Sequence, residues 1–277
     1  TVVMGYGKLA GVTVRDAQFP VGWDFVPGHR GHLRLHDASA QASRGRITGQ
    51  AELGWGETAR LTGQVRFGGI DVGELISHYS QSQMLGGIAS GRIDFAGREM
   101  RSAKDLAAHV DAKLAQTVPS QTPVFRQVMP MILPGVGANT QFQSGELRGN
   151  LGGGVFRIER LTLVGDLVRI YAEGTVTLQQ RLNLDVIANT NQLGIEPAGL
   201  QLLGIALPAF GPIPLATMNS AVSYLSNRTI SLRVSGTIKA PVVQVNPVPF
   251  LTETAVRFFL NQTGVPIPTA ALQAPPP

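Results

Sequence analysis

Three histidines close to the N-terminus, His29, His32 and His36, carry the side chains of this sequence that are best suited to chemistry. Alternate side chains of an extended strand share one face, so His32, Arg34 and His36 would project together. Two imidazoles in such an arrangement can ligate a metal ion. Because the cationic Arg34 stands between them, a solvated strand face is the favoured interpretation.

Other catalytic patterns fail on spacing. In 87–91 (GIASG) the serine comes one position late for a nucleophile elbow. In 5–11 (GYGKLAG) the last glycine misses the dinucleotide-binding spacing by one residue, and there is no Walker motif. Cysteine is absent, which excludes disulfides, thiolate metal sites and a cysteine nucleophile. No two carboxylates share an apolar setting that would raise a pKa. We therefore expect a protein that is not an enzyme and uses no cofactor or metal.

The composition favours a folded chain with apolar surface to spare. Of the 277 residues, 43% are hydrophobic and only 15% charged, which is unlike a disordered chain. Low charge with ordinary apolar content indicates that some apolar surface serves a purpose other than a sealed core. The net charge is +5, but the Lys and Arg residues are scattered and not interleaved with aromatic residues. Nucleic acid is therefore not an expected partner.

The elements that must position any site are built from one recurring phrase, in which a glycine is followed by alternating polar and apolar residues. Alternation with a period of two is typical of a strand with one wet and one dry face. The internal glycine permits a bulge or sharp coiling. The sequence thus predicts a mainly β protein, a long curved antiparallel sheet with a few short amphipathic helices. The copies are 47–53, 61–67, 89–95, 172–178 and 234–240, with a weaker one at 147–151.

Between these phrases the pattern predicts further elements. We expect a strand over 105–114, although a helix competes there, and tight hairpin turns at 165–166 and 179–180. Short helices are predicted within 72–80, 120–134 and 250–262. The segment 196–228 has no charged residue between its ends and is interrupted by prolines, which opposes a transmembrane helix. A loop that covers the core and a contact with a membrane remain alternatives for it. The helix at 250–262 would either close the end of the sheet or lie on a membrane or a partner.

Residues 1–265 are expected to form a single elongated domain, followed by a proline-rich, disordered tail at 266–277. The chain begins at Thr1 without the basic and apolar regions of a signal peptide. We expect it to be part of a longer protein whose membrane anchor lies upstream.

The order of these elements resembles the C-terminal region of AsmA-like proteins, which are related to the bridge-like lipid transport proteins of the TamB/AsmA type. The resemblance covers roughly 45–245 and lies in the succession of glycines and alternating strands. The segments that carry it are 61–75, 85–95, 140–149 (TQFQSGELRG), 156–165 (FRIERLTLVG), 170–178 (IYAEGTVTL), 182–186 (LNLDV) and 230–241 (ISLRVSGTIKAP).

The resemblance implies an open half-pipe, called a β-taco, in the periplasm of a Gram-negative-type envelope, anchored in the inner membrane. It also implies a role in phospholipid transport and outer-membrane biogenesis, with phospholipids as partners and no catalytic residues to carry over. The uncharged insert at 196–228 departs from the general pattern.

A curved sheet with an apolar concave face would hold acyl chains without strong specificity. A one-residue register slip would turn each strand over, so the facing of each strand remains open at this stage. The rival interpretations are a scaffolding protein whose groove is filled by the helices at 72–80, 120–134 and 250–262, and a hydrolase or metal enzyme that depends on His32. The predicted lipid-groove residues are Phe95, Ile158, Ile170, Val176, Leu184 and Val234.

Overall fold

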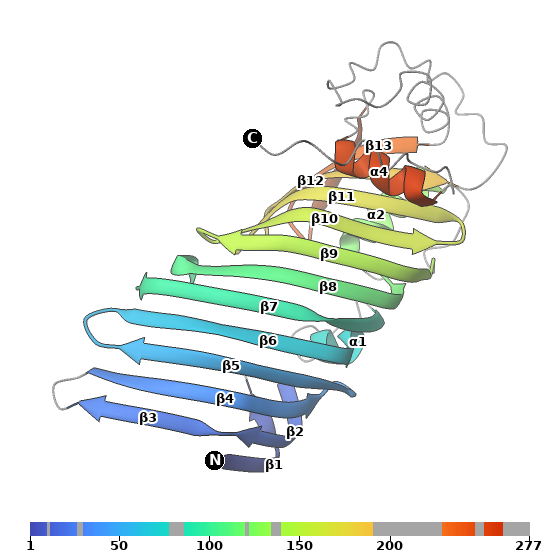
Figure 1. Cartoon of the computed structure of the whole chain (residues 1–277). Helices are drawn as coiled ribbons and strands as arrows, with labels where there is room; N and C mark the ends of the chain where they lie inside the picture. Colours follow the sequence, from blue (N-terminus) through green and yellow to red (C-terminus); the bar gives the residue numbers. More distant parts are fainter. Residues whose placement is uncertain are drawn as a thin grey trace, which may run out of the picture.

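The protein is one open antiparallel sheet of 14 strands, as shown by a computed structural model (Figure 1). The structure describes residues 1–9, 12–26, 30–77, 86–119, 122–133, 140–190, 229–246 and 252–262. Strands that follow one another in the chain are paired, with one exception. β2 and β3 do not pair with each other, and both pair with β4. This confirms the predicted mainly β fold with a long curved antiparallel sheet and a few short helices.

The strands are long in the middle of the sheet and shorter at its ends. The helices are α1 (Val72–Ser77), α2 (Pro123–Ile132) and α4 (Glu253–Gln262), with a short 3₁₀ turn at Ala103–Asp105. The strands are β1 (Val2–Leu9), β2 (Val12–Phe19), β3 (Val21–Val26), β4 (Arg30–Ala42), β5 (Gly45–Trp55), β6 (Ala59–Asp71), β7 (Gly86–Met100), β8 (Leu106–Val118), β9 (Phe142–Gly152), β10 (Val155–Gly165), β11 (Val168–Thr177), β12 (Leu182–Thr190), β13 (Thr229–Gly236) and β14 (Pro241–Val245).

Most elements follow the sequence pattern. The segment 105–114 is a strand, part of β8, and the competing helix is wrong. The turns at 165–166 and 179–180 join β10 to β11 and β11 to β12. The three predicted helices form as α1, α2 and α4. Residues 78–80, the whole insert at 196–228 and the tail at 266–277 lie outside the described residues.

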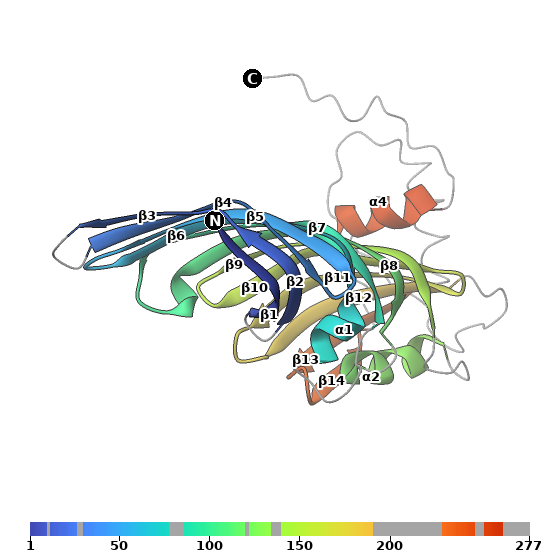
Figure 2. The ribbon, with the colours of Figure 1, turned by 90° about the horizontal axis from the view of Figure 1, so that it is seen from below.

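The sheet is curved, and its helices lie on both faces. Figure 2 shows α1 and α2 on the concave side and α4 on the convex side. Ala255 and Phe259 of α4 pack with Tyr171 and Ile187, which point away from the concave face. The rival interpretation, in which the helix at 250–262 helps to fill the groove, is therefore wrong for this helix: its apolar stripe packs against an apolar patch on the convex face of the sheet.

Glycines on the concave side explain how the sheet curves so strongly. A Cβ atom on Gly63 would lie 2.6 Å from the Gln50 carbonyl oxygen and 2.5 Å from the Phe95 ring. A Cβ on Gly49 would lie 2.6 Å from the Gln64 carbonyl oxygen. β5 and β6 pair without a register shift at Gly49 and Gly63, so there is no bulge at these glycines. Coiling of the strands is therefore the reason for the two glycines.

The main core lies between α2 and the concave side of β9 to β14. α2 begins at Thr122, whose hydroxyl accepts a hydrogen bond from the Phe125 N–H at 3.3 Å, and Pro123 occupies the first turn. The buried side chains of α2 are Val128, Met129 and Ile132, and Leu133 follows directly after the helix. This core is the best-sealed part of the molecule.

Candidate functional site

The concave face of the sheet is apolar across almost all of its strands. In an antiparallel pair, residues opposite each other point to the same side, so the pairing defines cross-strand rows. Three adjacent rows can be followed without interruption, and each consists only of glycine, alanine, valine, leucine, isoleucine and phenylalanine. The first row is Leu35, Ala51, Gly63, Phe95, Ala108, Leu151, Phe156, Val176 and Leu182. The second is Ala38, Gly49, Val65, Ile93, Val110, Gly149, Ile158, Gly174, Leu184 and Val234. The third is Ala40, Ile47, Phe67, Gly91, Ala112, Leu147, Leu161, Ala172, Val186 and Leu232.

The convex face carries the alternate residues of the same strands, and these are largely polar. Across β8 and β9, Arg148 forms an ion pair with Asp111 at 2.7 Å. On β7, the hydrogen bond from Arg92 holds the pKa of the Asp94 carboxyl below its ordinary value, with a further contribution from Gln64. The polarity of the two faces therefore decides which side of the sheet faces water and which side is available to apolar groups.

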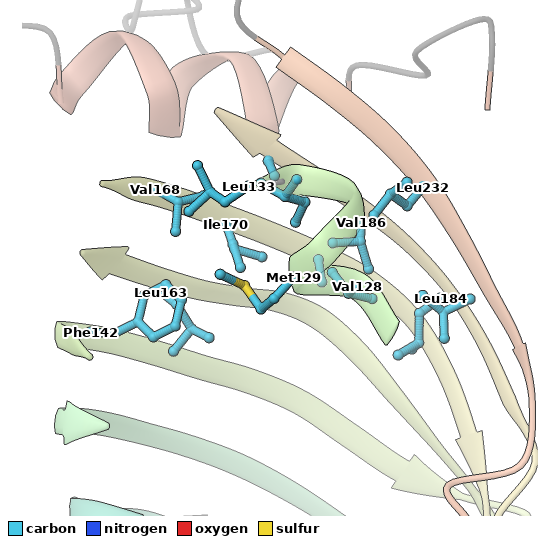
Figure 3. Packing of buried hydrophobic residues seen from close by; sticks show 14 of the residues in the cluster. Val128, Met129, Leu133, Phe142, Leu163, Val168, Ile170, Leu184, Val186 and Leu232 are labelled. Atoms are coloured by element: carbon cyan, nitrogen blue, oxygen red, sulfur yellow. The ribbon is translucent and has the colours of Figure 1, made fainter. Parts of the chain in front are cut away.

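All six predicted groove residues lie on the concave face. Ile158, Ile170, Leu184 and Val234 are buried in the core beneath α2, as Figure 3 shows for Ile170 and Leu184. Val176 is half-buried and packs at the margin of that core. Phe95 is half-buried and belongs to the other half of the sheet. The structure thus brings five of the six together and separates Phe95 from them.

The helix α2 covers part of the concave face. Its Met129 points toward Ile170 and Leu163, and its Val128 belongs to the same buried cluster (Figure 3). The opposite side of the helix is open to solvent, and Met131 there remains 41% exposed. We call the concave side of β9 to β14, where α2 packs, the covered face.

The concave side of β4 to β8 lacks such a helix among the described residues. α1 packs chiefly on β6 and β7, close to the point where it joins them. We call this region the open face. Of the six side chains that form its floor, the sequence pattern singled out only Phe95 as a groove residue, although three of the repeated phrases contain five of them. The half-buried side chains that define it are Leu53, Val65, Phe67, Ile93, Phe95 and Val110.

The histidine pattern forms no site in the structure. His32 and His36 are exposed on β4, and His29 lies outside the described residues. Arg34 approaches Asp24 at 3.7 Å and Glu52 at 3.9 Å, both on neighbouring strands. In the part of the chain that the structure describes, no three histidine, aspartate or glutamate side chains are grouped to hold a metal ion.

No protein-family model, curated protein or solved structure matches this chain. The resemblance to AsmA-like proteins therefore stays a prediction. Among the described residues, no helix has the length and apolar character needed to cross a membrane.

Proposed function

We propose that this protein is a non-enzymatic carrier whose open face binds the acyl chains of phospholipids. The observation that supports the proposal is the set of apolar rows that run from strand to strand while their side chains stay half-exposed on β4 to β8. A soluble protein rarely leaves such a continuous apolar surface without a partner. An acyl chain is the apolar partner that best fits a long, shallow and featureless surface.

The energetics suit movement as well as binding. Each methylene removed from water contributes about 0.8 kcal/mol, so two acyl tails can be held while the headgroup remains hydrated. The rows offer similar Val, Leu, Ile and Phe side chains at each step, so a bound chain would meet no strongly preferred position. Such a surface favours conduction along the strand order over storage at one site.

We further propose that the protein works in the periplasm of a bacterial envelope. In this proposal it is anchored in the inner membrane by a segment outside this chain, and it conducts phospholipid toward the outer membrane in support of outer-membrane biogenesis. The AsmA-like order of strands supports this location.

The decisive experiment is to measure lipid retention by the protein purified without detergent. Mass spectrometry of the organic extract should find phospholipid in the wild-type protein. In the triple variant Ile93→Asp, Phe95→Asp and Val110→Asp, three half-buried side chains of the open face become charged, so bound lipid should fall at least tenfold.

A matched variant controls for the added charge. Thr62→Asp, Gln64→Asp and Ala96→Asp change alternate positions of β6 and β7, on the convex face, and should retain lipid. Circular dichroism should show the same strand content in both variants. If wild-type protein is free of lipid, or if both triple variants retain equal amounts, the proposal is wrong.

A second candidate function is a scaffolding role in the envelope without lipid transport. It is favoured by α2, which already covers the concave side of β9 to β14. A lipid-free and monomeric wild-type protein in the same extraction would support it.

A further inference from the structure

The ends of the strands form two lips that border the concave face. We define the first lip by the turns that join β5 to β6, β7 to β8, β11 to β12 and β13 to β14. The second lip is formed by the opposite strand ends, where β4 turns into β5 and where β6 leads into α1. The long central strands therefore run from one lip to the other across the concave face (Figure 1).

The first lip carries basic side chains that form no hydrogen bond or ion pair with other described residues. Arg98, Lys104, Arg181 and Lys239 are exposed, and none of them makes a side-chain hydrogen bond or ion pair within the described part of the chain. On the convex face some arginines, such as Arg148, are paired with carboxylates, whereas Arg46 and Arg66 make no side-chain hydrogen bond or ion pair among the described residues. Unpaired cations are therefore not confined to the first lip, and the feature that distinguishes the lip is the uncovered apolar surface beside its cations.

The acidic residues of the first lip are only partly available to neutralise these cations. Asp105 accepts hydrogen bonds from the backbone N–H groups of Arg101 and Ser102, both at 2.8 Å, so its carboxylate holds the turn together. Glu57 is paired with Arg30 at 3.3 Å. Glu99 makes no such bond within the described residues, and it is the acid that would compete with a bound anion.

The second lip differs in its charge pairing. There Arg44 approaches the carboxylates of Asp71 at 3.5 Å and Glu74 at 3.6 Å. In addition, α2 reaches the concave face from the β8 to β9 connection, on this side of the sheet. The second lip thus offers an arginine that is already neutralised.

Uncovered apolar surface lies directly beside the first lip. Leu53, Leu61 and Leu106 are the half-buried concave residues next to its turns. At the lip itself, Trp55 and Leu178 remain 37% and 49% exposed. Tryptophan and basic residues beside an apolar surface are the groups that proteins place at the level of lipid headgroups.

We propose that the first lip binds the phosphate of the headgroup of a phospholipid whose acyl chains lie on the open face. This inference rests on the proposed function and adds the substrate class: phospholipids with a net negative charge are taken in preference to zwitterionic ones. In a zwitterionic lipid the headgroup ammonium competes for the phosphate and repels the same cations. Each Lys or Arg near an anionic lipid surface contributes a factor of about five in affinity.

The test measures which lipid the whole chain takes up from mixed vesicles. Vesicles of equal parts phosphatidylglycerol and phosphatidylcholine are incubated with the protein, and the lipid bound after separation is identified by mass spectrometry. The wild-type protein should be enriched in phosphatidylglycerol. The variant Arg98→Glu, Lys104→Glu and Lys239→Glu should lose this enrichment at least tenfold while still binding lipid. Glu99→Gln should increase it.

The control variant Arg15→Glu, Arg46→Glu and Arg66→Glu makes the same change in net charge at exposed positions of the convex face and should keep the enrichment. Equal loss in both triple variants would show a general effect of net charge and overturn the proposal. Lipid binding with no preference in the wild-type protein would overturn it too, while leaving the proposed function intact. Absence of any bound lipid would instead contradict the proposed function.

Discussion

The covered face and the open face are built from the same kind of strand, yet they are buried to different extents. In β11, Ile170 and Tyr171 are adjacent residues on opposite faces, and both are at most 2% exposed. α2 packs on the side of Ile170 and α4 on the side of Tyr171, so this region has three layers. In β7, Ile93 and Phe95 are only half-buried, because the sheet there is a single layer in the described part of the chain.

The difference shows that alternation decides which face is apolar but does not decide whether that face is sealed. Sealing depends on α2 and α4, and both pack near one end of the strand order. A one-layer sheet buries each side chain only against its neighbours within the sheet. The open face therefore keeps apolar surface that a ligand can still cover.

The largest expected effect comes from placing a charge in each region. Ile170→Asp should lower the free energy of unfolding by about 3 to 5 kcal/mol, because the carboxylate would be buried without a partner. Phe95→Asp should cost no more than about 2 kcal/mol, since its side chain still reaches water. Urea unfolding followed by circular dichroism measures both. Equal losses would mean that the open face is sealed after all.

Removing the apolar contact of α2 should be the next largest effect. Met129→Ala should lower the free energy of unfolding by about 2 to 5 kcal/mol, because Met129 is buried and its loss leaves a cavity. Met131→Ala, on the solvent side of the same helix, should change it by less than about 0.5 kcal/mol. Similar values for the two variants would contradict the seating of α2 on the covered face.

A glycine on the open face tests the origin of the curvature. Gly63→Ala should cost about 1 to 3 kcal/mol, because the added methyl group meets the Gln50 carbonyl oxygen and the Phe95 ring. Gly68→Ala serves as the control, since a Cβ there would have nothing within 4 Å. The urea midpoints should separate the two, and an unchanged midpoint for Gly63→Ala would remove coiling as the reason for the repeated glycine.

The smallest expected effect concerns α4 and is confined to alkaline pH. Burial, followed by the charge of Glu173, raises the pKa of Tyr171 from 10 to about 12. Because the folded state favours the neutral phenol, this contribution to stability is complete below pH 10 and is lost as the pH rises toward about 12. The urea midpoint of wild type should fall more steeply over this interval than that of Tyr171→Phe. Parallel curves would show that the phenol does not titrate with unfolding.

Much of the fold could be predicted from the local pattern of the sequence. The strict alternation within 105–114 was enough to predict a strand, and the apolar residues within 120–134 were enough to predict a helix there. The side of the sheet on which α4 packs was not predictable, because an amphipathic stripe specifies that it needs an apolar partner and not which one. Tyr171 and Ile187, its partners, are apolar residues on a largely polar face.

The candidate groove, too, could be predicted only in part from the sequence. The alternation of apolar and polar residues was enough to select the six predicted groove residues. In the structure, four of these side chains are buried in the core beneath α2. Which apolar positions stay uncovered depends on contacts between residues far apart in the chain, such as Met129 with Ile170. Sequence spacing contains no information about those contacts.

By itself, the sequence determined a long sheet with one apolar and one polar face, because side chains alternate along any strand and the register that pairs like with like is strongly favoured. The tertiary structure alone decided that the apolar face is concave, that α2 seals one part of it and that free cations border the rest. These features arise from how strands coil around glycines such as Gly63 and from where the connecting helices pack, and both are settled only when the whole sheet is assembled.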